Sequence, residues 1–181
     1  MIDLNSKSNY SNTMKHKRIC FVGMSGIGKS SFGNLLAKKY QLPFLDTDTL
    51  IESKIPISIK NYLKTKTEKS FLELEETVVL ELSFPEKIII ATGGSLIYCD
   101  KAMTHLKNHC TIIYLNDSLA NIKSRIKDFD QRGIVMNGNK TLEDVYNERL
   151  LLYDKWSDLT ITYPKKFSIP SILSIIEKEI L

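Results

Sequence analysis

The sequence predicts an α/β fold in which helices cover both faces of a parallel sheet. Short β-like runs alternate with longer helical stretches from Arg18 onward, which is the pattern of β-α-β units. A glycine-rich loop directly follows the first run and precedes the first helical stretch. The chain has 181 residues, of which 43% are hydrophobic, so it can bury one core and we expect a single domain over 18–181.

Five short apolar runs are the expected strands, because each is apolar enough to be buried on both faces. They are Ile19–Val22, Pro43–Leu45, Lys87–Ala91, Thr111–Leu115 and Leu159–Thr162. Apolar residues at three- and four-residue spacing predict the helices between them. These are Lys29–Tyr40, a helix containing Phe71–Leu82, Lys101–Lys107, Ser118–Ile126, Leu142–Trp156 and Ile169–Ile180.

Three segments depart from this alternation. Lys54–Lys69 predicts a short helix or two inserted after the second strand. Asp128–Thr141 is rich in glycine, asparagine and charge, too polar to pack and too long for a tight connection, so it is typical of a mobile lid. Residues 1–17 are polar and lack the apolar stretch of a signal peptide, so we expect a disordered extension and a cytoplasmic protein.

Composition excludes several classes of function. A net charge of +4 is too mild for a nucleic-acid platform and better suits a small phosphate-bearing ligand. No apolar run approaches the roughly 18 to 20 residues of a membrane span. Cys20, Cys99 and Cys110 lack metal-ligand spacing, so we expect buried or incidental thiols. No feature indicates an oligomer, and we expect a monomer.

The glycine-rich loop is the strongest functional signal. Gly23 to Ser30 spell G-x-x-x-x-G-K-S between the first expected strand and helix. Its glycines let backbone N–H groups face a phosphate at a helix N-terminus, Lys29 can reach the outer phosphates, and Ser30 can place its hydroxyl on Mg²⁺. A plain glycine-rich turn is the alternative, but the flanking strand and helix favour phosphate binding.

Two aspartates follow the second expected strand. Asp46 and Asp48 stand where the carboxyl ends of parallel strands hold ligands. Phosphoryl transfer needs a carboxylate for the metal and another to accept a proton, and this pair could supply both. Capping of the next helix by Asp46-Thr47-Asp48 is the alternative. We favour the functional interpretation.

The third expected strand ends in Thr92-Gly93-Gly94. Two glycines at that place let another molecule approach the backbone closely. A simple loop turn explains this segment about as well.

The arginines are few and clustered. Only four of the 25 basic residues are arginines, and Arg125, Arg132 and Arg149 stand in a stretch with just two lysines, Lys127 and Lys140. This distribution indicates positions that require a planar, bidentate donor for phosphate, carboxylate or a stacked base. Ordinary helix-surface charge is the alternative.

Together these motifs resemble the shikimate kinase family, P-loop NTPases similar to nucleoside-monophosphate kinases. The resemblance covers about 19–181. The family's F-R-x-x-E helix, G-G-G strand end, lid R-P-L and late R-x-P-L-Y correspond here to Phe71–Glu75, Gly93-Gly94-Ser95, Arg132-Gly133-Ile134 and Arg149–Tyr153. It implies a three-layer α/β/α fold with a five-stranded parallel sheet in order 2-3-1-4-5. It also implies ATP-dependent phosphorylation of a ring hydroxyl of shikimate, with Mg²⁺, in aromatic amino acid biosynthesis.

The resemblance also assigns roles to individual residues. Lys29, Asp48 and Arg132 would be catalytic, with Asp48 accepting the hydroxyl proton, while Ser30 and Asp46 would hold Mg²⁺. The ATP-binding residues would be Gly26, Gly28, Lys29, Ser30, Ser31, Arg125 and Lys165. The substrate-binding residues would be Asp48, Glu75, Gly93, Gly94 and Arg149, with substrate-binding helices over about 47–80 and a lid over about 128–141.

Two positions depart from the family pattern. Leu72 stands where the family has the arginine that grips the shikimate carboxylate, and Ser95 replaces the third glycine. Three functions therefore stay open: a kinase of shikimate, a kinase of another small polyol or sugar acid, and a nucleotide-binding module without transfer activity. The presence of Lys29, Ser30, Asp48 and Arg132 argues against the third.

Overall fold

The computed structural model describes residues 17–125, 134–136, 138, 140–164, 166 and 168–180. They contain a five-stranded parallel sheet in the order β2-β3-β1-β4-β5, which confirms the expected order. The strands are β1 (Arg18–Val22), β2 (Phe44–Asp46), β3 (Ile88–Ala91), β4 (Thr111–Asn116) and β5 (Leu159–Thr162). Each strand bound lies within one residue of its predicted place.

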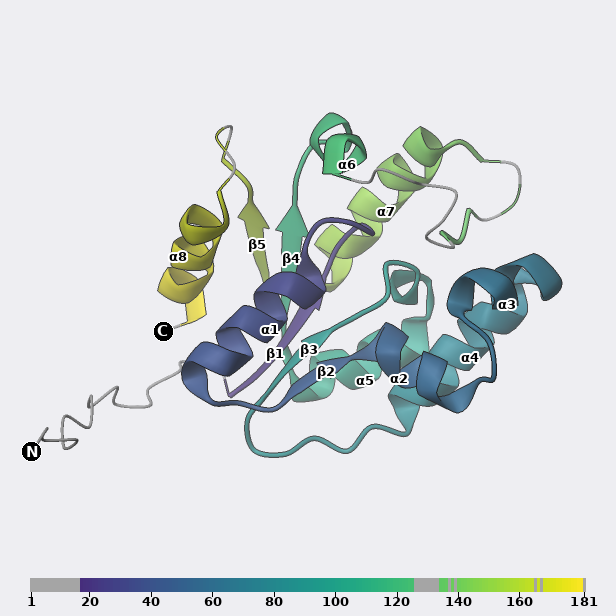
Figure 1. The fold of residues 1–181 in the computed structure, drawn as a ribbon, viewed down its shortest axis with the longest axis horizontal. Helices are drawn as coiled ribbons and strands as arrows, with labels where there is room; N and C mark the ends of the chain where they lie inside the picture. Colours follow the sequence, from purple (N-terminus) through teal and green to yellow (C-terminus); the bar gives the residue numbers. More distant parts are fainter. Residues whose placement is uncertain are drawn as a thin grey trace, which may run out of the picture.

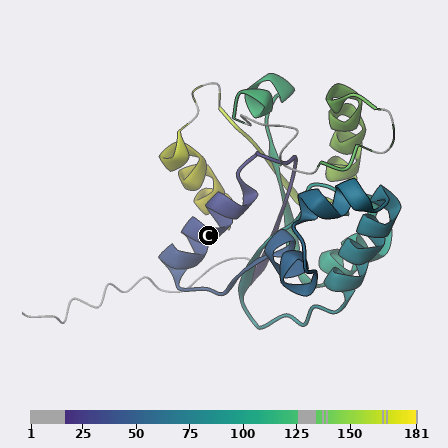
Figure 2. The same cartoon turned by 45° about the vertical axis from the view of Figure 1, so that its right-hand side comes forward.

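Helices cover both faces of this sheet (Figures 1 and 2). On one face lie α1 (Lys29–Tyr40) and α8 (Ile169–Ile180), and on the other lie α4 (Glu68–Leu80), α5 (Asp100–His109) and α7 (Leu142–Trp156). The strands have apolar side chains on both faces because both are covered, and Ile89, Ile90, Ile112 and Ile113 are fully buried. The three-layer α/β/α prediction is confirmed.

Local sequence sets the helix ends. α1, α7 and α8 have the predicted bounds, and α7 starts with a capping box between Thr141 and Asp144. α4 begins three residues before Phe71 because Thr67 caps it, its side chain accepting from Ser70 N. That helix ends at Leu80, so Leu82 lies beyond it but still packs against the core.

The segment after β2 forms two short helices, α2 (Thr47–Lys54) and α3 (Ile59–Thr65). They pack on α4 through a second apolar cluster, separate from the sheet core, that contains Ile51, Ile59, Phe71, Val78 and Val135. In Figure 1 these helices lie to one side of the sheet, beside its β2 edge. The cluster thereby forms a wall next to the carboxyl ends of the strands.

Some predictions concern residues outside the described ranges. Residues 1–16 are among them, while Lys17 is described and pairs with Glu86 at 3.0 Å. Of the expected lid, residues 134–136, 138, 140 and 141 are described, and Val135 is 2% exposed although the segment was expected to be too polar to pack. The lid and domain bounds stay predictions. The three cysteines are free and buried, as expected.

Candidate active site

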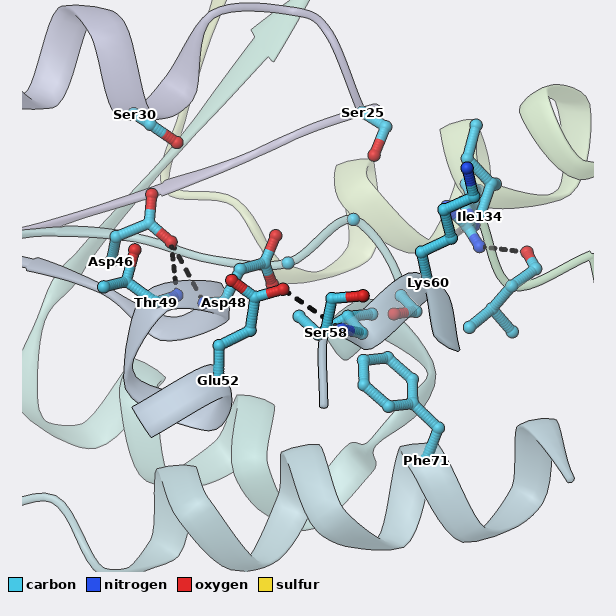
Figure 3. A pocket seen from close by; sticks show the side chains of 16 residues that line it. Ser25, Ser30, Asp46, Asp48, Thr49, Glu52, Ser58, Lys60, Phe71 and Ile134 are labelled. Carbon is cyan, nitrogen blue, oxygen red and sulfur yellow. Dashed lines mark hydrogen bonds between the residues drawn. The ribbon is translucent and has the colours of Figure 1, made fainter. Parts of the chain in front are cut away.

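A cavity of about 430 Å³ opens at the carboxyl ends of β1, β2 and β3 (Figure 3). The predicted residues that line it are Ser30, Asp46, Asp48, Gly93, Gly94 and Arg149. They come from the P-loop, the junction of β2 and α2, the loop after β3, and α7, which are distant in sequence. The structure therefore brings together the four motifs that the sequence singled out.

The P-loop (Gly23–Ser30) has the conformation that only glycine adopts readily. Gly23, Gly26 and Gly28 have φ angles of +143°, +79° and +105°. A Cβ on Gly23 would lie 2.6 Å from Leu115 O, and one on Gly28 2.8 Å from the Phe32 ring. The loop is thus a close-fitted cradle, and it leads directly into α1 at Lys29.

Lys29 lies folded onto the loop itself. Its buried Nζ donates hydrogen bonds to Gly23 O at 2.7 Å and Met24 O at 2.9 Å. These bonds hold a cation at the phosphate cradle. The next two side chains, Ser30 and Ser31, are exposed in the first turn of α1.

Asp46 both caps a helix and faces the cavity, so the capping and the functional interpretations of its motif apply together. Its Oδ1 caps α2, accepting from Asp48 N at 3.0 Å and Thr49 N at 3.3 Å, as the capping alternative predicts. Its other carboxylate oxygen points toward Ser30 in Figure 3. One oxygen therefore builds the helix and the other faces the cavity.

Asp48 lies in the first turn of α2, facing the cavity and Gly93. Burial raises the pKa of its carboxyl group to about 6, with Lys29 opposing the shift and Asp46 and Glu52 adding to it. A carboxylate with a pKa near 6 is mostly ionised at neutral pH and is a better proton acceptor than an ordinary aspartate.

The loop after β3 is held by two hydrogen bonds from other motifs. Gly93 N donates to Thr47 Oγ1 at 2.9 Å, and Tyr153 OH donates to Gly94 O at 2.8 Å. A Cβ on Gly93 would lie 2.5 Å from Glu75 Oε1 and 2.6 Å from Asp48 Oδ1. Two carboxylates thus close over the α-carbon of Gly93, which requires glycine there.

Glu75 is buried beneath this loop and does not line the cavity. Ser95 Oγ donates to its Oε2 at 2.6 Å, while its Oε1 has no hydrogen-bond partner in the described part of the chain. Burial raises the pKa of Glu75 to about 8, with Asp48 adding to the shift and Ser95 and Arg149 opposing it. Glu75 is therefore mostly protonated at neutral pH, and Ser95 is its partner.

We expect Glu75→Gln to flatten the dependence of stability on pH. A carboxyl group whose pKa is about 8 in the folded protein, against an ordinary value of 4.5, makes the wild type lose stability as pH rises from about 5 to 8. The amide stays neutral at every pH. The wild type should therefore lose roughly 1 to 3 kcal/mol of unfolding free energy over this pH range that the variant keeps. Urea unfolding at pH 5, 6, 7 and 8 measures this.

Glu73→Gln, on the exposed part of the same helix, is the control and should keep the wild-type profile. A Glu75→Gln profile as steep as the wild type would show that Glu75 is ionised in the folded protein.

Arg149 lines the cavity beside the loop that follows β3 and is 1% exposed. Its Nη2 donates to Val135 O at 2.6 Å, and its Nε donates to Tyr98 OH at 3.4 Å. Its guanidinium lies 5.1 Å from the centre of the Tyr98 ring. Nη1 faces Gly94, where a Cβ would be 3.3 Å away.

The expected adenine side is described only in part. Arg125, at the end of α6 (Leu119–Arg125), forms an ion pair with Asp117 and lies 5.3 Å from the centre of the Tyr163 ring. Tyr163 OH donates to Ile27 O at 2.7 Å, which ties this aromatic ring to the P-loop. Arg132 and Lys165 lie outside the described residues, so their assignments stay predictions.

For several lining residues the sequence predicts no individual role. They are Ser25, Glu52, Ser58, Lys60, Phe71 and Ile134. Ser58 and Lys60 come from the insertion predicted over Lys54–Lys69 and Glu52 from just before it, within the range where substrate-binding helices were expected but no residue was singled out. Thr47 was likewise missed, since only the fold shows that its hydroxyl reaches Gly93.

Two features are absent from the described residues. Within them, no group of three or more His, Cys, Asp and Glu side chains is placed to hold a metal ion. No helix in the same ranges has the length and apolar character needed to cross a membrane.

Comparisons with known proteins agree with the geometry. The shikimate kinase family model matches residues 25–178. A shikimate kinase of Staphylococcus aureus (strain JH9) is 36% identical over 145 residues, covering 78% of this chain and 83% of that protein. One of Thiobacillus denitrificans is 31% identical over 149 residues, covering 81% of each. The solved structure of Acinetobacter baumannii shikimate kinase in complex with shikimate matches with a TM-score of 0.78 at 27% identity, covering 90% of this chain and 92% of that one.

Proposed function

The chain belongs to the shikimate kinase family, and we propose that its cavity is where the γ-phosphoryl group of ATP passes to a ring hydroxyl of shikimate. The observation that carries the proposal is the position of Asp48. Its carboxylate lies between the phosphate cradle and the Gly93-Gly94 loop, facing the cavity.

Asp48 would hold the attacking hydroxyl and accept its proton. The carboxylate is fixed by the first turn of α2, which Asp46 caps, and by its contact with Gly93. Its raised pKa of about 6 gives it more affinity for the proton than an exposed aspartate while leaving it ionised at neutral pH.

Lys29 would neutralise charge on the moving phosphoryl group. Its ammonium group is already at the cradle, bonded to two carbonyl oxygens that a phosphate oxygen would replace or join. We propose the same electrostatic role for Arg132, on the strength of its place in the family's lid motif. Gly26, Gly28, Ser30 and Ser31 would bind the phosphates through the loop and the start of α1.

Ser30 and Asp46 would hold Mg²⁺. The donor set fits, because both groups supply oxygen and the free Asp46 oxygen points toward Ser30. When bound with ATP, the ion neutralises phosphate charge. On the adenine side we propose Arg125 and Lys165, as the resemblance implies.

Gly93, Gly94 and Arg149 would face the acceptor. Glu75 would act beneath them as a positioning residue, because it is buried and bonded to Ser95 rather than exposed to the cavity. Arg149 would pair with the acceptor carboxylate through Nη1, the guanidinium nitrogen that faces Gly94.

The pH dependence of turnover tests the role of Asp48. We expect kcat/KM for shikimate to fall below about pH 6, with a slope of one in the logarithmic plot, because protonated Asp48 no longer accepts the hydroxyl proton. Initial rates between pH 5 and 8 at saturating Mg-ATP measure this. A profile that stays flat down to pH 5 would contradict the assignment.

A kinase of another polyol is the second candidate, since Leu72 leaves the pocket without the family's helix arginine. ADP release with Mg-ATP decides between them, comparing shikimate with sugar acids, cyclitols and nucleosides, and with no acceptor. Turnover stimulated by shikimate at sub-millimolar KM supports the proposal. A response to another polyol alone would replace it, and ATP binding without any turnover would favour a nucleotide-binding module.

A further inference from the structure

The cavity is lined by both acidic and cationic side chains. Asp46, Asp48 and Glu52 supply carboxylates, while Lys60 and Arg149 are the cationic side chains among the described lining residues. In Figure 3, Lys60 lies across the cavity from Asp46 and Ser30. An acceptor that carries a carboxylate is repelled by the lining carboxylates and attracted to the two cations.

Arg149 uses part of its hydrogen-bonding capacity within the protein. Two of its three nitrogens donate within the protein, to Val135 O and Tyr98 OH. Nη1, with two N–H groups, faces Gly94. The two oxygens of a carboxylate together have about four acceptor sites, so a carboxylate bound by Arg149 still has room for a second donor.

Lys60 is the cation placed to be that donor. It lies in the first turn of α3 and is partly exposed, and within the described ranges no hydrogen bond or ion pair holds its ammonium group. Its backbone is nevertheless fixed. The preceding residue, Ile59, is buried in the second apolar cluster, and Ile59 N donates to Glu52 Oε1 at 3.0 Å.

Position 72 does not supply this charge. Leu72 packs against both apolar clusters and is not among the lining residues. Glu75, one turn later, is bonded to Ser95 instead of to a cation. The helix that carries both residues therefore contributes no positive charge to the cavity, and α3 contributes Lys60.

We propose that Lys60 binds the carboxylate of the acceptor together with Arg149, and so determines the preference of this enzyme for an anionic acceptor. The inference rests on the proposed function. Lys60 holds the substrate by its carboxylate and takes no part in proton transfer.

The test compares Lys60→Met with Lys64→Met. Lys64 lies one turn further along α3, is exposed and does not line the cavity, so its substitution removes the same charge from the same helix. We expect Lys60→Met to raise KM for shikimate roughly 10- to 50-fold, as for a lost charge-assisted hydrogen bond, with kcat and KM for ATP within about threefold of wild type. Lys64→Met should match wild type, and Lys60→Arg should recover most of the affinity.

A neutral acceptor separates binding of the carboxylate from damage to the fold. The methyl ester of shikimate keeps the ring hydroxyls and loses the charge. The wild type should prefer shikimate to the ester by kcat/KM, and Lys60→Met should reduce that preference about tenfold, which a merely structural role of Lys60 would not do.

Each outcome decides something. A raised KM with reduced discrimination in Lys60→Met supports the inference. Unchanged KM and discrimination, in a wild type that phosphorylates shikimate, overturns the role of Lys60 and leaves the proposed function standing. A wild type that does not turn over shikimate overturns both.

Discussion

Asp48→Asn is expected to lower kcat by at least about 100-fold while KM for ATP stays within about threefold. The amide keeps the shape of the side chain and its contact with Gly93 but accepts no proton. The nucleotide site is built from the P-loop and α1, which the substitution does not touch. Steady-state kinetics with shikimate, together with calorimetric titration of ATP, measure both effects.

The same substitution should stabilise the ligand-free protein at neutral pH. The pKa of Asp48 is raised to about 6 in the folded state from 3.8, so the wild type loses stability as pH rises from about 4 to 6. The neutral amide avoids that loss, and we expect a gain on the order of 1 to 3 kcal/mol at pH 7 that shrinks toward pH 4. Stability gained with activity lost is typical of a strained catalytic group.

Asp154→Asn is the matched control, since Asp154 is exposed on α7 and makes no contact with the cavity. It should leave kcat and the unfolding profile unchanged. Near-normal turnover of Asp48→Asn would remove Asp48 from the mechanism.

Gly93→Ala is expected to reduce kcat by about 100-fold or more through geometry alone. The added methyl group would lie 2.5 Å from Glu75 Oε1 and 2.6 Å from Asp48 Oδ1, so at least one carboxylate must move. Displacement of a proton acceptor by even 1 Å costs on the order of 100-fold. Kinetics with shikimate measure the loss, and the affinity for ATP should be unchanged.

Gly33→Ala is the control, because it should lower stability without displacing the proton acceptor Asp48. Its Cβ would lie 2.6 Å from the Phe44 ring, between α1 and β2. We expect each glycine variant to lose about 1 to 3 kcal/mol of unfolding free energy through overpacking, and only Gly93→Ala to lose turnover. Equal losses of turnover in both variants would attribute the effect to general destabilisation.

The parts of the fold that the sequence predicts are those encoded locally. The strands are apolar runs such as Ile88–Ala91. The start of α1 is marked by the end of the P-loop, and the start of α7 by the capping pair of Thr141 and Asp144. The strand order came from the resemblance to a family. The motif residues Ser30, Asp48, Gly93 and Arg149 meet in one cavity because parallel strands end at one edge of the sheet.

The rest of the site depends on contacts that a local pattern does not encode. Ser95 stands in place of the family's third glycine, and the structure shows that it lines the cavity and that its hydroxyl donates to Glu75. Lys60 lies in the insertion predicted over Lys54–Lys69, where no motif distinguishes it from the neighbouring lysines. The packing of Ile59 in the second apolar cluster fixes the start of its helix beside the cavity. Such roles follow from tertiary contacts between helices.

The hydrogen bond from Arg149 to Val135 O joins the acceptor side of the cavity to the segment that follows Arg132 in sequence. A bound acceptor that strengthens or weakens this hydrogen bond changes the stability of the segment's position. Because coupling between two sites is reciprocal, a shift of the segment for another reason changes the affinity for the acceptor by the same free energy. If nucleotide binding also shifts the segment, each substrate changes the affinity for the other by the same factor. The order in which they arrive then leaves the stability of the ternary complex unchanged.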